Sequence, residues 1–209
     1  MDFAGNLLGQ YYTNDNVDLD DSNSYNIDAY PNTGEHSLCT TGEMLTNYFA
    51  AQNVRTEHET AEFDYALHFT ADGKAQGEAA NTVRICFPEY KLTYFTYDAE
   101  KNGYLATNWD LAWADANTGE VAPFQNLLIL DAPTTIGADA KWHSIIKLEN
   151  QEGTGFYCNG GSYEPITWKR GDVTEPFHYY DAQGNELELG IGRTYIGIMS
   201  MAHGGVTFG

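Results

Sequence analysis

Apolar and polar residues alternate with a period of two over much of the second half of this chain. In 63–69 the apolar residues occupy every second position, with Asp64 and His68 between them. An unbroken apolar run, 127–130, ends the segment 124–130. Alternation predicts a strand with one buried face, and an unbroken run predicts a strand buried on both faces. The segments for which we expect strands are 63–69, 83–87, 91–98, 124–130, 142–149, 153–158, 165–170 and 192–196.

Turn residues separate these segments and predict that successive strands run antiparallel. Asn159-Gly160 is typical of a two-residue hairpin loop, and Asn102-Gly103 marks a second hairpin. Asp181 followed by Gly184 favours a slightly longer loop. Gly153-Thr154-Gly155 resembles the start of a dinucleotide-binding loop, but it leads into a strand. A helix N-terminus that could hold a pyrophosphate is therefore missing, and we reject that interpretation.

One segment in the first quarter has the spacing of a helix. Thr40 precedes Glu43 by three residues, which is the pattern of a capping box. The apolar residues Met44, Leu45, Tyr48 and Phe49 then share one face, and Asn53 can end the helix. The fold class that we predict is α+β, a mixed and mainly antiparallel β-sheet with one prominent helix packed on it.

A chain of 209 residues with 42% hydrophobic residues can bury a sizeable core in one large domain or in one and a half ordinary ones. Met1 is followed directly by Asp-Phe-Ala-Gly, from which we expect a piece of a longer protein. The expected division is 1–55 as the tail of a preceding domain or an N-terminal arm, 56–200 as a β-rich domain, and 201–209 as a C-terminal tail.

The formal charge of −20, from 30 acidic and 10 basic residues, argues against binding to nucleic acid or to anionic lipid. Solubility explains such an excess as readily as a site for a cationic ligand does. The sequence holds no apolar run long enough to span a bilayer, so we expect no direct membrane insertion by this chain.

The three cysteines, Cys39, Cys86 and Cys158, cannot all pair within one chain, and none has the close spacing of a zinc or redox motif. Cys86 and Cys158 lie in predicted strands, where a small buried hydrophobic role is expected. A disulfide between two of the three stays open.

The polar segment 14–32 contains five aspartates, which raises a calcium hypothesis. Every EF-hand register that starts at Asp15, Asp18 or Asp20 lacks the glycine and the glutamate that the loop requires. We expect an ordinary solvated loop there, with a calcium-dependent surface protein as an alternative.

The sequence lacks a nucleophile elbow, a phosphate-binding loop and a metal-ligand motif, and its six histidines are scattered. We expect no cofactor and no metal. One enzymatic alternative is a glycan hydrolase that uses two carboxylates from the segment between Asp98 and Glu120, near Trp109 and Trp113. The competing role for Trp109, Trp113 and Trp168 is packing in the core or on an edge strand.

An ordered set of short motifs runs from about residue 35 to residue 198. The N-terminal part of the set is His36-Ser37-Leu38 and Thr41-Gly42-Glu43. The remaining motifs are Tyr94 to Asp98, Gly103-Tyr104, Asp115 with Thr118-Gly119, Asn126 to Ile129, Gly153 with Gly155, Asn159-Gly160, Thr167-Trp168 and Gly192 to Ile196. Each piece is common, whereas the ordered set is far more specific. It resembles the C-terminal part of the YerB-like lipoproteins of bacteria, a family whose biochemical activity is undefined.

The resemblance implies an extracellular or cell-surface protein, and we favour a non-catalytic module that binds a protein partner or an extracellular polymer. The residues expected to contribute to binding are His36, Asp98, Trp109, Trp113, Asp115 and Trp168. Two positions depart from the pattern of the family, because Ala106 and Trp113 stand where an arginine and a histidine are usual. A polar site built from those two residues is therefore in doubt in this chain.

Overall fold

The computed structural model describes residues 25–26, 38–39, 41–54, 56–57, 65–87, 91–115, 117–136 and 144–209. The chain divides into two compact units, Met1–Phe63 and Asp64–Gly209. The role expected for residues 1–55, as the tail of a preceding domain or as an arm, stays a prediction.

The first unit contains helix α2, Gly42–Gln52, and an antiparallel pair formed by β1, Tyr25–Asn26, and β2, Leu38–Cys39. Thr41 caps the helix, because its backbone is extended and its Oγ1 accepts a hydrogen bond of 3.1 Å from the backbone N–H of Met44. The capping box expected from Thr40 and Glu43 is therefore wrong by one residue. Asn53 ends the helix in the left-handed conformation, as predicted.

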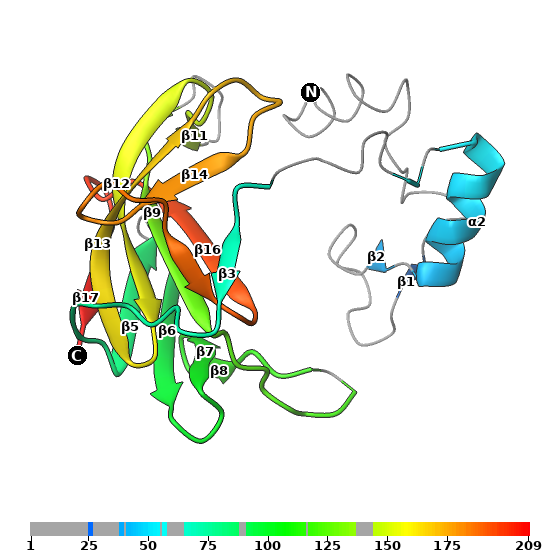
Figure 1. Ribbon diagram of the computed structural model, residues 1–209. Helices are drawn as coiled ribbons and strands as arrows, with labels where there is room; N and C mark the ends of the chain where they lie inside the picture. The colour runs from blue at the N-terminus through cyan, green and yellow to red at the C-terminus, as the bar shows by residue number, and fades with distance from the viewer. Residues whose placement is uncertain are drawn as a thin grey trace. The chain divides into compact units, whose positions relative to one another are not determined.

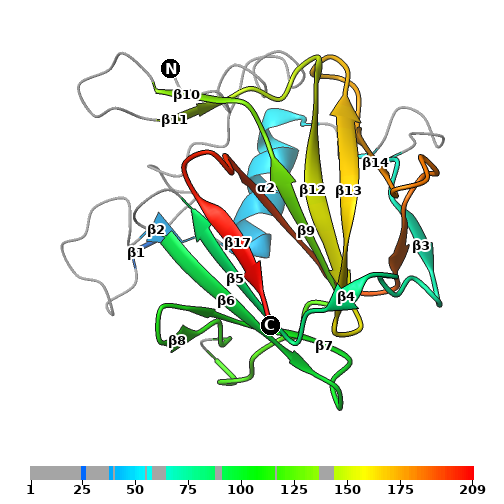
Figure 2. The same ribbon diagram turned by 90° about the vertical axis from the view of Figure 1, so that its left-hand side faces the viewer.

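The second unit is built from two larger sheets (Figures 1 and 2). The first sheet has the strand order β14-β13-β12-β9-β16, with β4 paired to β13. Its strands are β4 (Glu78–Ala79), β9 (Asn126–Asp131), β12 (Gln151–Asn159), β13 (Ser162–Arg170), β14 (Phe177–Tyr180) and β16 (Thr194–Met199). The second sheet has the order β17-β5-β6-β7-β8. Its strands are β5 (Thr82–Phe87), β6 (Lys91–Asp98), β7 (Gly103–Asn108), β8 (Leu111–Ala112) and β17 (Gly205–Phe208).

Two short pairs complete this unit. The strands β10, Thr134–Ile136, and β11, Ser144–Ile146, pair antiparallel, and β3, His68–Thr70, pairs parallel with β15, Glu188–Gly190. The pair β16–β9 is also parallel, while all other pairs of described strands are antiparallel. The predicted β-rich α+β class, with a mixed and mainly antiparallel arrangement, is confirmed. The packing of the helix on a sheet remains a prediction.

Strand β9 is buried on both faces, as its apolar run predicts. Leu127 and Ile129 enter a core shared with the second sheet, beside Val83, Ile85 and Phe95. Leu128 and Leu130 enter a separate core on the opposite face, beside Tyr157, Trp168 and Leu189. A strand with two apolar faces needs a layer on each side, and this explains why the strands divide into two sheets rather than one curled sheet.

Close approach of the Trp168 indole explains the glycine at position 153. A Cβ atom on Gly153 would lie 2.7 Å from Trp168 Nε1 and closer still to the carbonyl oxygen of Asp131. The indole Nε1 donates a 3.0 Å hydrogen bond to that same carbonyl. The glycine therefore leaves room for the largest fully buried side chain of the core.

Asn126 lies at the start of β9 and is fully buried. Its Oδ1 accepts hydrogen bonds from the Tyr157 hydroxyl (2.9 Å) and the Gly190 N–H (3.0 Å), and its Nδ2 donates to the Gly190 carbonyl (2.7 Å). The Tyr157 hydroxyl also lies within hydrogen-bond distance of the Gly73 carbonyl. These bonds tie the segments around residues 73 and 190 to the first sheet, so the asparagine of the Asn126–Ile129 motif has a structural role.

One turn prediction needs correction, and another is confirmed. The loop between β12 and β13 is Gly160-Gly161, both with positive φ, while Asn159 is the last residue of its strand. Residues 201–209, expected as a C-terminal tail, contain β17, whose pairing with β5 places the end of the chain in the second sheet (Figure 2). The loop that begins at Asp181 is confirmed, because Asp181 Oδ1 accepts hydrogen bonds from the N–H groups of Gln183 and Asn185.

Cys158 is fully buried and Cys86 is half-buried, and both are free thiols. The expected hydrophobic role thus fits Cys158, while the side chain of Cys39 lies outside the described residues. Of the predicted segment 63–69, only residues 68 and 69 belong to a described strand, β3, which pairs parallel with β15.

Candidate functional site

Three loops that are far apart in sequence meet through the side chain of Gln125. Its Oε1 accepts a 2.9 Å hydrogen bond from the N–H of Arg193, and its Nε2 donates a 3.4 Å bond to the carbonyl of Asn102. Gly192, at φ 142°, leaves no room for a side chain, since a Cβ there would lie 2.5 Å from Gln125 Cγ. The turns near residues 103 and 192 therefore lie together at Gln125. We call the region formed by Asn102, Gln125 and Arg193 the turn end.

The turn end contains an open hollow of about 870 Å³. Two cationic residues, Lys101 and Arg193, and two acidic residues, Asp115 and Glu120, contribute to its lining. The other lining residues are mostly apolar or small: Leu105, Thr118, Gly119, Val121, Ala122 and Pro123. The hollow thus combines charged side chains of both signs with apolar ones.

Asp98 and Asp115 both fix turns with one carboxylate oxygen. Asp98 Oδ1 accepts hydrogen bonds from the N–H groups of Glu100 (2.9 Å) and Lys101 (3.0 Å). Asp115 Oδ1 accepts them from Thr118 (2.8 Å) and Asn117 (3.0 Å). The backbone N–H of Thr118, followed by that of Asn117, holds the pKa of the Asp115 carboxyl below its ordinary value.

The hairpin that joins β7 to β8 exposes two large apolar side chains. Its two-residue loop is Trp109-Asp110, because Asn108 pairs directly with Leu111. Trp109 is 60% exposed and Leu111 is 77% exposed. Trp109 also has φ 51°, a left-handed conformation that is unfavourable for a bulky side chain, and its N–H donates a 3.1 Å bond to the Leu92 carbonyl. We call Trp109 and Leu111 the hairpin surface.

Trp113 and Ala106, the two positions that depart from the family pattern, lie opposite each other. The N–H of Trp113 donates a 3.0 Å hydrogen bond to the carbonyl of Ala106, which is fully buried. The Trp113 ring makes edge contacts with Phe124 and Tyr195, at centroid distances of 6.1 and 5.9 Å. An apolar pair thus occupies both positions, and Trp113 packs against the core between the sheets.

The remaining predicted site residues do not join the turn end. The Trp168 side chain is buried in the core, so it packs there and does not contact a ligand. His36 lies outside the described residues, as do the five aspartates of segment 14–32 that raised the calcium hypothesis. Of the six predicted binding residues, the structure therefore places Asp98, Trp109, Trp113 and Asp115 on the second sheet and its turns.

Sequence analysis missed Lys101, Arg193 and Leu111. The signal that could have found the two cations is their rarity, because only 10 of the 209 residues are basic and these two fall inside or beside the turn motifs. Their common hollow could not be found in this way, since it depends on the contacts of Gln125 with two distant loops.

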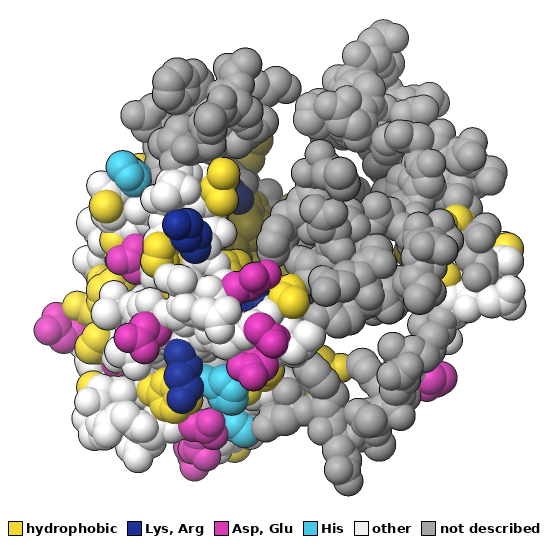
Figure 3. All heavy atoms as spheres, turned by 90° about the horizontal axis from the view of Figure 1, so that it is seen from above, with side chains coloured by type: hydrophobic (Ala, Val, Ile, Leu, Met, Phe, Trp, Pro, Cys, Tyr) yellow, Lys and Arg dark blue, Asp and Glu magenta, His cyan; other side chains and the backbone are white. Residues whose placement is uncertain are grey.

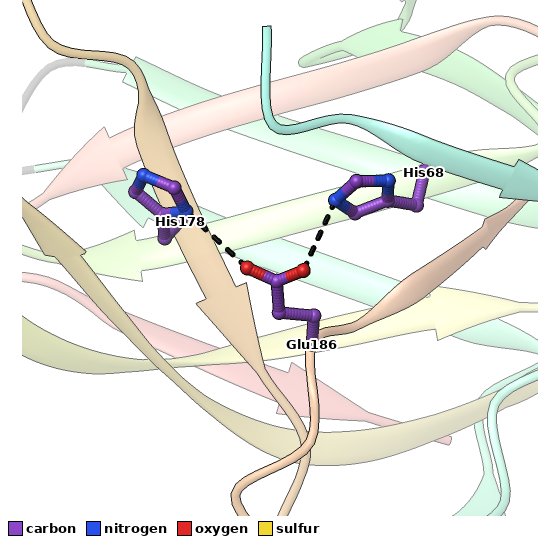
Figure 4. A network of polar contacts seen from close by, with 3 residues as sticks. All are labelled: His68, His178 and Glu186. Carbon is purple, nitrogen blue, oxygen red and sulfur yellow. Dashed lines mark ion pairs between the residues drawn. The ribbon is translucent and has the colours of Figure 1, made fainter. Parts of the chain in front are cut away.

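A second polar cluster joins β3, β14 and the loop before β15 (Figure 4). Glu186 lies between two imidazoles, with Oε2 3.2 Å from His68 Nε2 and Oε1 3.5 Å from His178 Nδ1. The latter nitrogen is buried and makes no hydrogen bond, so the 3.5 Å approach is a contact without a hydrogen bond. Among the residues that the structure describes, no group of three or more potential ligands is arranged to hold a metal ion.

Charged side chains of both signs lie interspersed with apolar ones over the described part of the face shown in Figure 3. Within the described ranges, no helix has the length and apolar character needed to cross a membrane.

Comparison with known proteins supports the resemblance drawn from the motifs. The crystal structure of the YerB protein from Bacillus subtilis superposes with a TM-score of 0.73 at 21% sequence identity, which shows a shared fold. The match covers 91% of this chain and 61% of that chain, so this chain spans about three fifths of the length of its structural relative. Among proteins with curated descriptions, no sequence matches. The profile described as "Protein of unknown function (DUF3048) C-terminal domain" matches residues 83–196, more than half of the chain. The chain therefore belongs to the DUF3048 family, and this region is its C-terminal domain.

Proposed function

We propose that this chain is a non-catalytic binding module of the bacterial envelope. It binds a protein partner or an extracellular polymer through the hairpin surface. The extracellular or cell-surface location follows from the family resemblance, and the mode of binding is argued from the exposed side chains of the second sheet.

The single observation that supports binding most strongly is the conformation and exposure of Trp109. A bulky residue at φ 51° costs about 1–2 kcal/mol relative to ordinary backbone conformations, and glycine would avoid this cost. The indole does not recover the cost by burial, because it is 60% exposed. Backbone strain of this kind concentrates at functional sites, and tryptophan is enriched among the residues that dominate binding energies.

The state of the carboxylates supports binding over hydrolysis. A general acid for glycoside cleavage requires a raised pKa. The pKa of the Asp115 carboxyl is lowered, and Asp98 uses an oxygen to hold the turn that follows it. Both carboxylates therefore stabilise turns, a role that does not require a substrate. Measured turnover of a glycan, lost in Asp98→Asn or Asp115→Asn, would favour the hydrolase instead.

Site-specific photo-crosslinking in the bacterium that carries the gene tests the proposal. A benzophenone amino acid replaces Leu111, which leaves Trp109 intact beside the probe. The matched control places the same probe at Ile145, which is 52% exposed and lies on β11, outside the second sheet.

We expect a discrete adduct from position 111 that disappears when Trp109→Gly is added, and no such adduct from position 145. Absence of any adduct from position 111 would refute the proposal. Equal adducts from both positions, or an adduct that persists in the Trp109→Gly variant, would also contradict it.

A further inference from the structure

Lys101 and Arg193 are two of the 10 basic residues in a chain whose formal charge is −20. Between described residues, no ion pair joins Lys101 or Arg193 to a carboxylate. Both nevertheless line the same hollow at the turn end. The two cations and the apolar wall offer a subsite for an anionic group, and the two carboxylates of Asp115 and Glu120 line the same hollow.

Backbone hydrogen bonds fix the positions from which these cations project. The N–H of Lys101 donates to Asp98 Oδ1 (3.0 Å), which anchors the turn before Gly103. Arg193 is held on both sides, since its N–H donates to Gln125 Oε1 (2.9 Å) and its carbonyl accepts from Asn126 N–H (3.1 Å). Both backbones are therefore organised before a ligand arrives, which lowers the entropic cost of binding.

Backbone hydrogen bonds also fix the hairpin that carries the two acidic lining residues. The N–H of Asp115 donates to the Glu120 carbonyl (2.9 Å), and the N–H of Gly119 donates to the Asp115 carbonyl (2.8 Å). The Glu120 N–H is held by Thr118 Oγ1 at 3.2 Å. This short hairpin carries Asp115 and Glu120 into the lining, where the hydrogen bonds to Asp115 keep its carboxylate ionised.

We infer that the hollow binds a zwitterionic ligand, a short peptide with a free ammonium and a free carboxylate. The carboxylate contacts Lys101 and Arg193, and the ammonium contacts Asp115 and Glu120. Leu105, Val121 and Pro123 accept an apolar side chain between the two ends. A simple anion is repelled by the large negative charge of the chain, whereas a ligand with no net charge avoids that repulsion and gains from both ends. This site is carried by different residues from the hairpin surface, so either proposal can fail without the other.

Binding of the tripeptide Ala-Val-Ala to the purified chain at low ionic strength tests this inference. The peptide is used with free ends, with an acetylated N-terminus and with an amidated C-terminus, and inorganic phosphate serves as the simple anion. The variants are Arg193→Ala, Lys101→Ala and Glu120→Gln, with Lys147→Ala as a control that removes an exposed cation outside the hollow. Unfolding in urea verifies that each variant is folded. We expect all of them to fold, because the hydrogen bonds that position residues 101, 120 and 193 use their backbone atoms, which the substitutions leave in place.

We expect the free peptide to bind, and Arg193→Ala to weaken it about tenfold while Lys147→Ala leaves it unchanged. Amidation of the peptide should cause a similar loss and make binding insensitive to Arg193→Ala. Acetylation should likewise remove the effect of Glu120→Gln. The inference is overturned if the chain binds no form of the peptide, if blocked and free peptides bind equally, or if phosphate binds as tightly as the peptide.

Discussion

Replacement of Asn126 by alanine is expected to destabilise the fold more than any surface change. The side chain is fully buried and takes part in five hydrogen bonds, with Tyr157, Asn159, Gly190 (two bonds) and Thr194. Alanine removes all five, but the partners are not affected equally. The Gly190 N–H and the Tyr157 hydroxyl stay paired with each other at 3.0 Å.

The expected magnitude follows from the partners that the substitution leaves unpaired. The carbonyl of Gly190 loses its 2.7 Å donor in a buried setting, which costs about 1–3 kcal/mol. Asn159 Nδ2 loses its 2.8 Å acceptor in a partly buried setting, which adds about 1 kcal/mol. The cavity left by the amide adds to both, so we expect the free energy of unfolding to fall by about 3–5 kcal/mol.

Urea unfolding, followed by circular dichroism and tryptophan fluorescence, measures this change. Asn159→Ala is the matched control, because it removes the 2.8 Å bond to Asn126 but leaves the Gly190 carbonyl paired, for an expected loss of about 1 kcal/mol. A loss below about 1 kcal/mol for Asn126→Ala, or equal losses for both variants, would refute the reasoning.

Three further results are expected. Gly153→Ala should lose about 1–3 kcal/mol of unfolding free energy through overlap with the Trp168 indole, whereas Gly205→Ala, with open space around its Cβ, should lose less in the same urea titration. Burial raises the pKa of the Cys158 thiol, so a thiol reagent at neutral pH should modify Cys86 first and Cys158 only on unfolding; equal rates would contradict this. The Asp115 carboxyl should titrate by NMR below its ordinary pKa of 3.8, so the turn is stabilised above that pH and loosens as the pH falls through the lowered pKa; a value above 3.8 would contradict the cap.

The parts of the fold that sequence could predict are those set by local pattern. The apolar run 127–130 indicated a strand buried on both faces, and β9 has that burial because each face meets a different core. Asn53 could be identified as the end of the helix because its left-handed conformation is a local preference. The start was missed because Thr40 and Thr41 are adjacent and both can cap; the backbone decides between them.

The parts that sequence could not predict depend on contacts between distant segments. Asn126 belongs to a motif, but its role requires Tyr157, Gly190 and Gly73. These residues come from β12, from the end of β15 and from the segment after β3. The hollow likewise requires Gln125 to hold Arg193 beside the turn that carries Lys101. Trp109 was selected for its neighbours in sequence, while its exposure and its positive φ are properties of the folded hairpin.

The central claim is that Trp109 is retained for recognition and not for folding, and the free energy of unfolding of the Trp109→Gly variant tests it most directly. Glycine relieves the left-handed strain of about 1–2 kcal/mol and loses about 1 kcal/mol to the greater freedom of the unfolded chain, while little buried surface is removed. The account predicts a stability within about 1 kcal/mol of the natural chain, or above it. A loss of about 2 kcal/mol or more would show that the indole holds the fold together and would contradict the account.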